Sequence, residues 1–283
     1  MRVFVTGVKG QLGHDVMNEL AKRGHEGIGV DIEEMDITDA ESVRKVITEA
    51  NPDVVIHCAA WTAVDLAEDD DKKEKVHQVN AVGTENIAKV CHDLDCKMIY
   101  ISTDYVFDGQ GTRPWEPDDE RHPLNVYGQT KYEGELAVEK WVKKFYIVRI
   151  AWVFGVNGKN FIKTMLNLGK THDHLTVVDD QVGSPTYTYD LSRLLVDMAE
   201  KENYGRYHAT NEGLCSWYEF ACEIFRAAGM DVKVTPVHSD EYPAAKAKRP
   251  MNSRISKEKL SDNGFERLPS WQDAVGRYLK EIQ

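Results

Sequence analysis

Two tyrosines and a lysine stand close together in the stretch NVYGQTKYEGE, residues 125–135. Tyr127 and Lys131 are four residues apart, so on a helix they share one face. Tyr132 lies about 100° away from Lys131 round such a helix. Its own position four residues on holds Leu136 instead of a lysine. A phenol with an ammonium one turn away suits proton transfer, and this spacing selects Tyr127.

The chemistry that fits this pair is the reduction of a ketone. Such a reaction requires a hydride donor and a proton donor to the developing alkoxide. A free phenol has a pKa of about 10, and a nearby ammonium lowers that value by favouring the phenolate. We expect Lys131 to do this for Tyr127 and to hold the nicotinamide ribose. The competing interpretation is a structural ion pair between Lys131 and Glu135, which also lies four residues away.

Small and hydroxyl-bearing residues follow two predicted strands, 53–56 and 97–102. Thr103 comes at the end of the second strand and is expected to donate a hydrogen bond that orients the substrate oxygen. Gly128, next to the candidate tyrosine, is expected to leave room for a cofactor or substrate. After the first strand, small side chains would let a cofactor approach closely, in the stretch Ala59, Ala60, Trp61, Thr62.

A glycine-rich turn, TGVKGQLG, joins a predicted strand at 3–5 to a predicted helix at 11–23. Gly7 permits the tight turn, Gly10 lets a pyrophosphate approach, and Gly13 lets the helix pack closely. The start of the helix offers free N–H groups and a partial positive charge to phosphates. The position of the motif, between a first strand and a first helix, predicts dinucleotide binding.

Asp31 ends the second predicted strand, 27–30. A carboxylate there accepts hydrogen bonds from the adenosine ribose hydroxyls, which favours NADH. Lys9 lies in the glycine turn and is within reach of a 2′-phosphate, which favours NADPH. We therefore predict that both cofactors bind. Asp36 and Ile37 are expected near the adenine.

The elements that must position these residues alternate along the first half of the chain. Predicted helices at 40–50, 78–94 and 125–143 separate the strands already named from one another and from a strand at 145–150. This rhythm predicts an α/β fold, a Rossmann-type doubly wound parallel sheet with a smaller C-terminal substrate-binding lobe. We assign 1–155 to an NAD(P)-binding domain, completed by 186–210, and 156–283 mainly to the substrate lobe. In that lobe, the tail after residue 229 is expected to mix polar loops with short elements.

Composition excludes several classes of protein. The net charge is −12 and no basic block is present, which argues against nucleic-acid binding. Five cysteines without a CxxC pair indicate a reducing compartment, and we expect a cytoplasmic protein. No leader is expected, and no apolar run approaches the roughly 20 residues that span a bilayer. No metal-ligand cluster is predicted.

Longer strings carry a resemblance to a known family. TGxxGxxG, the strand-end threonine and YxxxK are similar to the extended short-chain dehydrogenase/reductases. More specifically, the chain resembles the dTDP-4-dehydrorhamnose reductase family from residue 2 to about residue 272. The matching strings are STDYVFDG (102–109), PLNVYGQTKYEGE (123–135), AWVFG (151–155), DDQVGSPT (179–186) and RPMNSRIS (249–256).

The resemblance implies reduction of the 4-keto group of dTDP-6-deoxy-L-lyxo-4-hexulose by NADPH or NADH, giving dTDP-L-rhamnose. It makes Tyr127 the proton donor and Lys131 its partner. Thr103, Asp104 and Trp152 would then contact the sugar. The family also implies a homodimer and, in some members, Mg²⁺. The residues that it places at the cofactor are Gly10, Gln11, Leu12, Asp31, Asp36, Ile37, Ala60, Trp61 and Thr62.

The two phosphates of a dTDP-sugar require positive partners. Arg249 and Arg254 flank a short segment that includes Asn252, and we expect these three residues to bind the nucleotide. Two alternatives remain at this point. One is a nucleotide-sugar epimerase or dehydratase, which regenerates its cofactor in each cycle. The other is a non-catalytic NADP-binding regulatory subunit.

Overall fold

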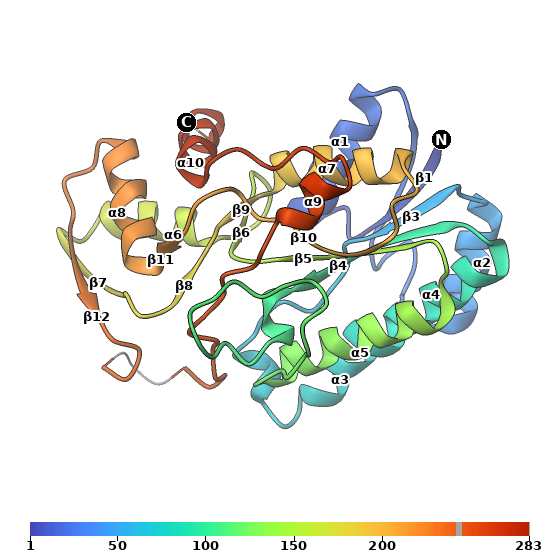
Figure 1. Cartoon of the computed structure of the whole chain (residues 1–283), viewed down its shortest axis with the longest axis horizontal. Helices are drawn as coiled ribbons and strands as arrows, with labels where there is room; N and C mark the ends of the chain where they lie inside the picture. Colours follow the sequence, from blue (N-terminus) through green and yellow to red (C-terminus); the bar gives the residue numbers. More distant parts are fainter. Residues whose placement is uncertain (242–244, 283) are drawn as a thin grey trace.

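A six-stranded sheet forms the centre of the fold (Figure 1). The computed structural model describes residues 1–241 and 245–282. All neighbouring strands of this sheet are parallel, in the order β10-β5-β4-β3-β1-β2. The order reverses beside β1, and ligands bind at such a point, outside the carboxyl ends of the strands. The strands are β1 (Arg2–Thr6), β2 (Glu26–Val30), β3 (Val54–His57), β4 (Lys97–Thr103), β5 (Phe145–Ile150) and β10 (Gly205–His208).

Helices cover both faces of this sheet, as Figure 1 shows. Successive side chains of a strand point to opposite faces. In β1, Val3 and Val5 pack into the apolar cluster that holds Leu20 and Leu191, whereas Phe4 packs into the cluster that holds Val138. The predicted doubly wound parallel sheet is therefore confirmed. The first face carries α1 (Gln11–Lys22) and α7 (Thr188–Glu200), and the second carries α2 (Ala40–Ala50), α4 (Gly83–Leu94) and α5 (Val126–Trp141).

The segment before α4 departs from a simple helix. The predicted helix at 78–94 begins as a π-helix, η2 (Gln78–Val82), before α4 continues. Buried Asn80 in this turn accepts the Trp61 N–H at 2.8 Å and donates to Thr130 Oγ1 at 3.1 Å. These contacts join η2 to the end of β3 and to α5. Shorter helices precede and follow, η1 (Leu66–Glu68), α3 (Lys73–His77) and η3 (Asp104–Val106).

A third apolar cluster forms the core of the C-terminal lobe, which extends beyond one end of the sheet (Figure 1). Phe154, Phe220, Ile224 and Tyr278 are among its fully buried members. The lobe contains β6 (Val153–Phe154), α6 (Phe161–Gly169), β7 (His174–Val178), β8 (Val182–Gly183), β9 (Thr186–Tyr187), β11 (Cys215–Ser216), α8 (Trp217–Ala228) and β12 (Lys233–Val237).

The tail also differs from the expected loops with short elements. It contains α9 (Glu258–Asp262) and a twelve-residue helix, α10 (Trp271–Ile282). The apolar side chains of α10 recur at helical spacing and lie against α8 in the lobe core, which includes Trp271, Val275 and Leu279. Tertiary burial of this face stabilises a helix that its own propensity would leave marginal. None of the helices among residues 1–241 and 245–282 has the length and apolar character to cross a membrane.

Candidate active site

The glycine turn packs tightly against the end of β3. Gly7 has a φ of +70°, and a Cβ there would lie 2.8 Å from the Ala59 nitrogen. A Cβ on Gly13 would collide with the Gly7 carbonyl. Gly10 is the N-cap of α1 and brings no side chain to bind the first N–H groups of the helix. The turn therefore leaves backbone donors for an anion, and a dinucleotide pyrophosphate fits them.

Two adjoining cavities open along the carboxyl ends of the strands. The larger has a volume of about 770 Å³ and extends from the glycine turn to the C-terminal lobe. The smaller, of about 130 Å³, is lined by Asp31, Asp36 and Ile37, among others. The larger cavity brings together many of the predicted residues, namely Gly7, Gly10, Gln11, Leu12, Gly13, Asp31, Ala59, Ala60, Thr62, Thr103, Asp104, Tyr127, Lys131 and Trp152.

Helix α5 presents Tyr127 to this cavity in its first turn. The Asn125 side chain caps the helix by accepting the Gly128 N–H at 2.7 Å. The Tyr127 ring packs edge-on against Tyr105, with ring centroids 5.7 Å apart. A Cβ on Gly128 would collide with the Tyr105 carbonyl. The expectation that Gly128 makes room for a ligand is therefore wrong, because the space it leaves is filled by the chain that follows β4.

Thr103 is buried at the end of β4 and contacts the tyrosine hydroxyl. Its own hydroxyl donates to Asp104 Oδ1 at 3.0 Å and accepts the Tyr105 N–H at 3.2 Å. Burial raises the pKa of Asp104 to about 6, although hydrogen bonds oppose this. Burial also raises the pKa of Tyr127 to about 12. The predicted lowering of the Tyr127 pKa is therefore wrong, and the phenol is held in the form that donates a proton.

The spacing suggested Tyr127 or Glu135 as the partner of Lys131, but its ammonium forms a hydrogen bond with neither. Its Nζ donates to the Ile101 carbonyl at 2.7 Å and lies 4.1 Å from the centroid of the Tyr100 ring. Burial lowers the pKa of this lysine to about 7, while the charge of Glu135 acts to raise it. Lys131 thus lines the larger cavity, with its ammonium next to β4.

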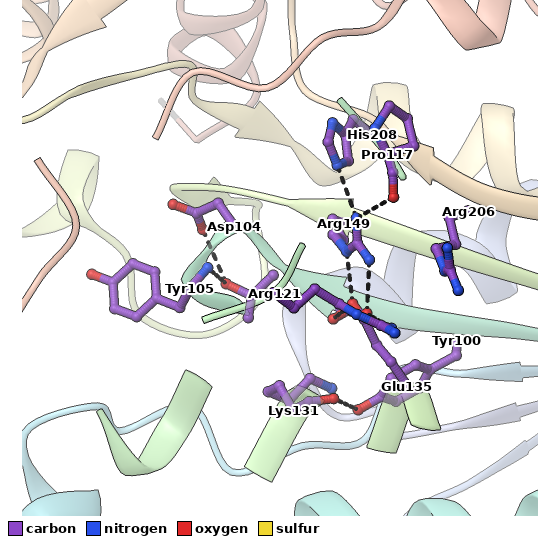
Figure 2. A network of polar contacts seen from close by, with 12 residues as sticks. Tyr100, Asp104, Tyr105, Pro117, Arg121, Lys131, Glu135, Arg149, Arg206 and His208 are labelled. Carbon is purple, nitrogen blue, oxygen red and sulfur yellow. Dashed lines mark hydrogen bonds and ion pairs between the residues drawn. The ribbon is translucent and has the colours of Figure 1, made fainter. Parts of the chain in front are cut away.

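Glu135 belongs instead to a buried ionic cluster (Figure 2). Its two oxygens accept hydrogen bonds from Arg149 Nε and Nη2, both at 2.8 Å. Arg121 Nη1 donates to Glu135 Oε2 at 2.8 Å and also to Glu139 Oε1. Arg149 further donates to His208 Nε2 at 3.2 Å. These partners hold the pKa of Glu135 down, at about 2, against the effect of burial.

An aromatic wall from the C-terminal lobe closes the other side of the cavity. Trp152 has a φ of +50°, a strained conformation for a tryptophan, and its ring stacks on Trp217 with centroids 3.8 Å apart. Phe161 and Phe220 line the same cavity. Sequence reasoning found Trp152 but missed the other three, because they lie on α6 and α8. Only the packing of the lobe brings them to the sheet.

The predicted phosphate-binding residues have protein partners. Arg249 pairs with Asp65, with Nη2 and Oδ2 2.6 Å apart. Arg254 Nη1 donates to Asn252 Oδ1 at 3.0 Å, and the Asn252 amide donates to the Arg113 carbonyl at 2.9 Å. The segment 249–254 therefore lies against the chain that follows β4, and the residues that line the larger cavity do not include Arg249, Asn252 or Arg254.

Trp61 does not lie with its small neighbours on the cavity wall. Its indole N–H donates to the Ala63 carbonyl at 3.2 Å. Gln11 has a contact that the sequence did not suggest, because its side chain accepts the Gly155 N–H at 2.9 Å. This bond ties the glycine turn to the lobe. Within the part of the chain that the structure describes, no group of three or more His, Cys, Asp or Glu side chains is arranged to hold a metal ion.

Comparison with known proteins identifies the family to which this chain belongs. The RmlD substrate binding domain family matches residues 1–283. The spore coat polysaccharide biosynthesis protein SpsK of Bacillus subtilis is 38% identical over 280 residues, which cover 99% of this chain and 97% of SpsK. A dTDP-4-dehydrorhamnose reductase structure from Clostridium acetobutylicum has a TM-score of 0.96 and 43% identity, with both chains fully covered.

A second solved structure, dTDP-4-dehydrorhamnose reductase from Bacillus anthracis in complex with NADP, has a TM-score of 0.95 and 40% identity over 99% of both chains. These similarities extend over the whole length of the chain and include both the sheet and the C-terminal lobe. This chain therefore belongs to the RmlD substrate binding domain family, the family of the dTDP-4-dehydrorhamnose reductases.

Proposed function

We propose that this protein reduces the 4-keto group of dTDP-4-dehydro-L-rhamnose with NADPH or NADH, giving dTDP-L-rhamnose. The observation that carries the proposal is the meeting of Thr103 and Tyr127 in the cavity that begins at the glycine turn. A protonated phenol there has a cofactor site on one side and an aromatic wall on the other. The names of the similar reductases support the same substrate.

A bound NADPH or NADH supplies the hydride that forms the new C–H bond at the sugar C4. Tyr127 donates its hydroxyl proton to the O4 oxygen as the carbonyl π electrons move onto that oxygen. Thr103 lies in contact with the phenol oxygen and positions it, so that the phenol proton is directed to O4 of the bound substrate. The charge of Lys131 favours the phenolate that remains, and this phenolate then regains a proton from solvent.

The same proposal assigns a part to each remaining group. The glycine turn binds the pyrophosphate, Asp31 the adenosine ribose, and the small pocket with Asp36 and Ile37 the adenine. Trp152 and its stacked neighbour Trp217 provide a flat apolar surface for the deoxysugar. Residues 1–155 with 186–210 bind the cofactor, and 156–283 bind mainly the nucleotide-sugar.

We also propose that the protein is a cytoplasmic homodimer. The resemblance to the family supports the dimer, and the five free cysteines support a reducing compartment. Light scattering tests the dimer.

The decisive assay mixes the purified protein with dTDP-4-dehydro-L-rhamnose and either cofactor. We expect one NADPH or NADH to be oxidised for each dTDP-L-rhamnose formed, measured by absorbance and by chromatography of the product. An epimerase or dehydratase would convert the sugar without net oxidation. A regulatory subunit would bind the cofactor with no turnover. Either result would overturn the proposal.

Glu33 is expected to weaken the use of NADPH. Its carboxylate lies 2.7 Å from Lys9 Nζ, and Asp31 accepts the Lys9 backbone N–H at 2.9 Å. We expect Glu33→Gln to free this lysine for a 2′-phosphate and to raise kcat/KM for NADPH by about two- to fivefold, the range of an exposed pair. The value for NADH should not change. Glu49→Gln, on the exposed face of α2, is the control. An unchanged kcat/KM for NADPH in Glu33→Gln would contradict the idea.

Arg249 is proposed to exchange its protein partner for the substrate diphosphate. Asp65 holds this guanidinium, and an anion with more charge competes for it. We expect Arg249→Met to raise KM for the dTDP-sugar about tenfold with little change in kcat, as for loss of one charged hydrogen bond. Asp65→Asn should lower KM. Arg226→Met, at an exposed pair on α8, is the control. An unchanged KM in Arg249→Met would remove this residue from the substrate site.

A further inference from the structure

The ammonium of Lys131 is buried, and no carboxylate of residues 1–241 and 245–282 forms an ion pair with it. Its hydrogen-bond partner is a carbonyl and its other neighbour is the face of the Tyr100 ring. Neither carries a full negative charge. Burial therefore acts against the charged form of this lysine and lowers its pKa to about 7, so nearby charges decide how much of the ammonium is present at neutral pH.

Glu135 lies one helical turn further along α5 and contacts the next residue of the same strand. The Ser102 hydroxyl donates to Glu135 Oε1 at 2.5 Å, while Lys131 binds the carbonyl of Ile101. Hydrogen bonds thus join Ile101 and Ser102, which are adjacent in β4, to two successive turns of α5. The residue that follows them is Thr103, so these contacts set where the end of β4 stands relative to the helix that carries the tyrosine.

Several titratable groups near Lys131 carry no charge at neutral pH. From β3 and its end, His57 is neutral because burial lowers its pKa to about 3, and the Cys58 thiol is neutral because burial raises its pKa to about 12. From β4, Tyr100 is a neutral phenol whose pKa burial raises. From α5, Tyr127 is also neutral. Among the described residues that influence this lysine, Glu135 is thus the one that carries negative charge at neutral pH.

Two arginines pair with Glu135, so loss of its negative charge would change the electrostatic balance around Lys131. Arg149 is fully buried and Arg121 nearly so, and both donate to this carboxylate (Figure 2). If the carboxylate became a neutral amide, Arg149 would remain buried without a carboxylate partner, whereas Arg121 would keep Glu139. The uncompensated charge of Arg149 would then act against the protonation of Lys131 in a region of low dielectric constant.

We propose that Glu135 is a positioning residue of the catalytic centre, which fastens α5 to the end of β4 and holds Lys131 in its charged state. The inference rests on the proposed reductase activity. Glu139 offers a matched control, since it lies on the same helix, has the same charge and binds Arg121 and Arg206. Unlike Glu135, it binds neither Ser102 nor Arg149.

The test is the pH dependence of kcat/KM for the ketosugar at saturating NADPH. The reaction requires a charged Lys131, so activity falls as pH rises through the pKa of this lysine. We expect Glu135→Gln to move this alkaline limb about one pH unit lower. Glu139→Gln should leave the alkaline limb at the wild-type pH. Glu135→Asp keeps the negative charge, so its alkaline limb should lie close to that of the wild type. An alkaline limb at the same pH in Glu135→Gln and the wild type would overturn the proposal.

Two further measurements cover the other outcomes. If Glu135→Gln does not fold, Ser102→Ala tests the positioning part. We expect kcat to fall about tenfold in that variant at constant KM and without a pH shift, and an unchanged kcat would overturn it. If the wild type reduces no ketosugar, the proposed function fails. NMR titration of Lys131 labelled at Cε would then compare its pKa directly in the wild type and Glu135→Gln, and equal values would overturn the inference.

Discussion

Tyr127→Phe is expected to lower kcat for ketosugar reduction by about 10²- to 10⁴-fold, the range of a lost general acid. The variant keeps the ring that packs on Tyr105 and removes the hydroxyl that contacts Thr103. Cofactor binding should survive, because the glycine turn and the adenine pocket are untouched. Stopped-flow kinetics measures the hydride transfer, and quenching of protein fluorescence measures the binding of NADPH.

Tyr132 provides the matched control for this experiment. Its ring lies 4.6 Å from the guanidinium of Arg121 and packs beside the cluster of Val106 and Ile255. Tyr132→Phe keeps both of these contacts, so we expect kcat within about twofold of the wild type, in line with substitutions outside a site. Full activity in Tyr127→Phe, or a large loss in Tyr132→Phe, would assign the proton to a different group.

Lys131→Met is expected to lose activity and gain stability at the same time. Methionine has a similar shape, so it fills the same space against Tyr100 without a charge. We expect kcat to fall about 10²-fold or more, because the phenolate of Tyr127 loses its cation. The free energy of unfolding should rise at pH 6 by a few kcal/mol, on the order of 2–4, since the variant no longer buries an ammonium.

The pH dependence of this gain follows from the direction of the pKa shift. The pKa of Lys131 is about 7 in the folded chain, against an ordinary value of 10.5. Between these values the unfolded chain binds one more proton, so the stability of the wild type rises with pH. The advantage of Lys131→Met should therefore be largest below pH 7 and shrink towards pH 10. Urea unfolding of both proteins at pH 6 and pH 9 measures this, and an equal gain at both values would contradict the assignment.

Local patterns accounted for much of the fold. Helix α2 and strand β5 begin and end at the residues that the sequence predicted, and α1 and β4 each differ from their predicted bounds by one residue. The glycine turn was readable for the same reason, because backbone sterics act within a few residues. The start of α4 and the whole of α10 were not, since each depends on partners distant in the sequence.

The candidate site also contains residues that the local sequence could predict and properties that it could not. Tyr127 and Thr103 could be selected from helical spacing and from the position of a strand end, and both lie in the cavity. The pKa of the tyrosine could not be predicted, because it depends on burial and on where the ammonium of Lys131 points. The aromatic wall could not be predicted either. Trp217 and Phe161 belong to helices of the C-terminal lobe, and nothing in their local sequence shows that these helices pack near the end of the sheet.

By itself, the sequence determined the parallel sheet, the dinucleotide turn and the prediction that Tyr127, and not Tyr132, faces the cavity. These follow from periodicity, glycine sterics and the pitch of one helix, which are properties of neighbouring residues. Only the tertiary structure decided the partners of Lys131 and Glu135. Both charges are buried, and the groups that satisfy them come from β4, β5 and the loop before α5. Which groups meet in a low-dielectric interior is set by how the layers pack, and spacing along the chain carries no information about that.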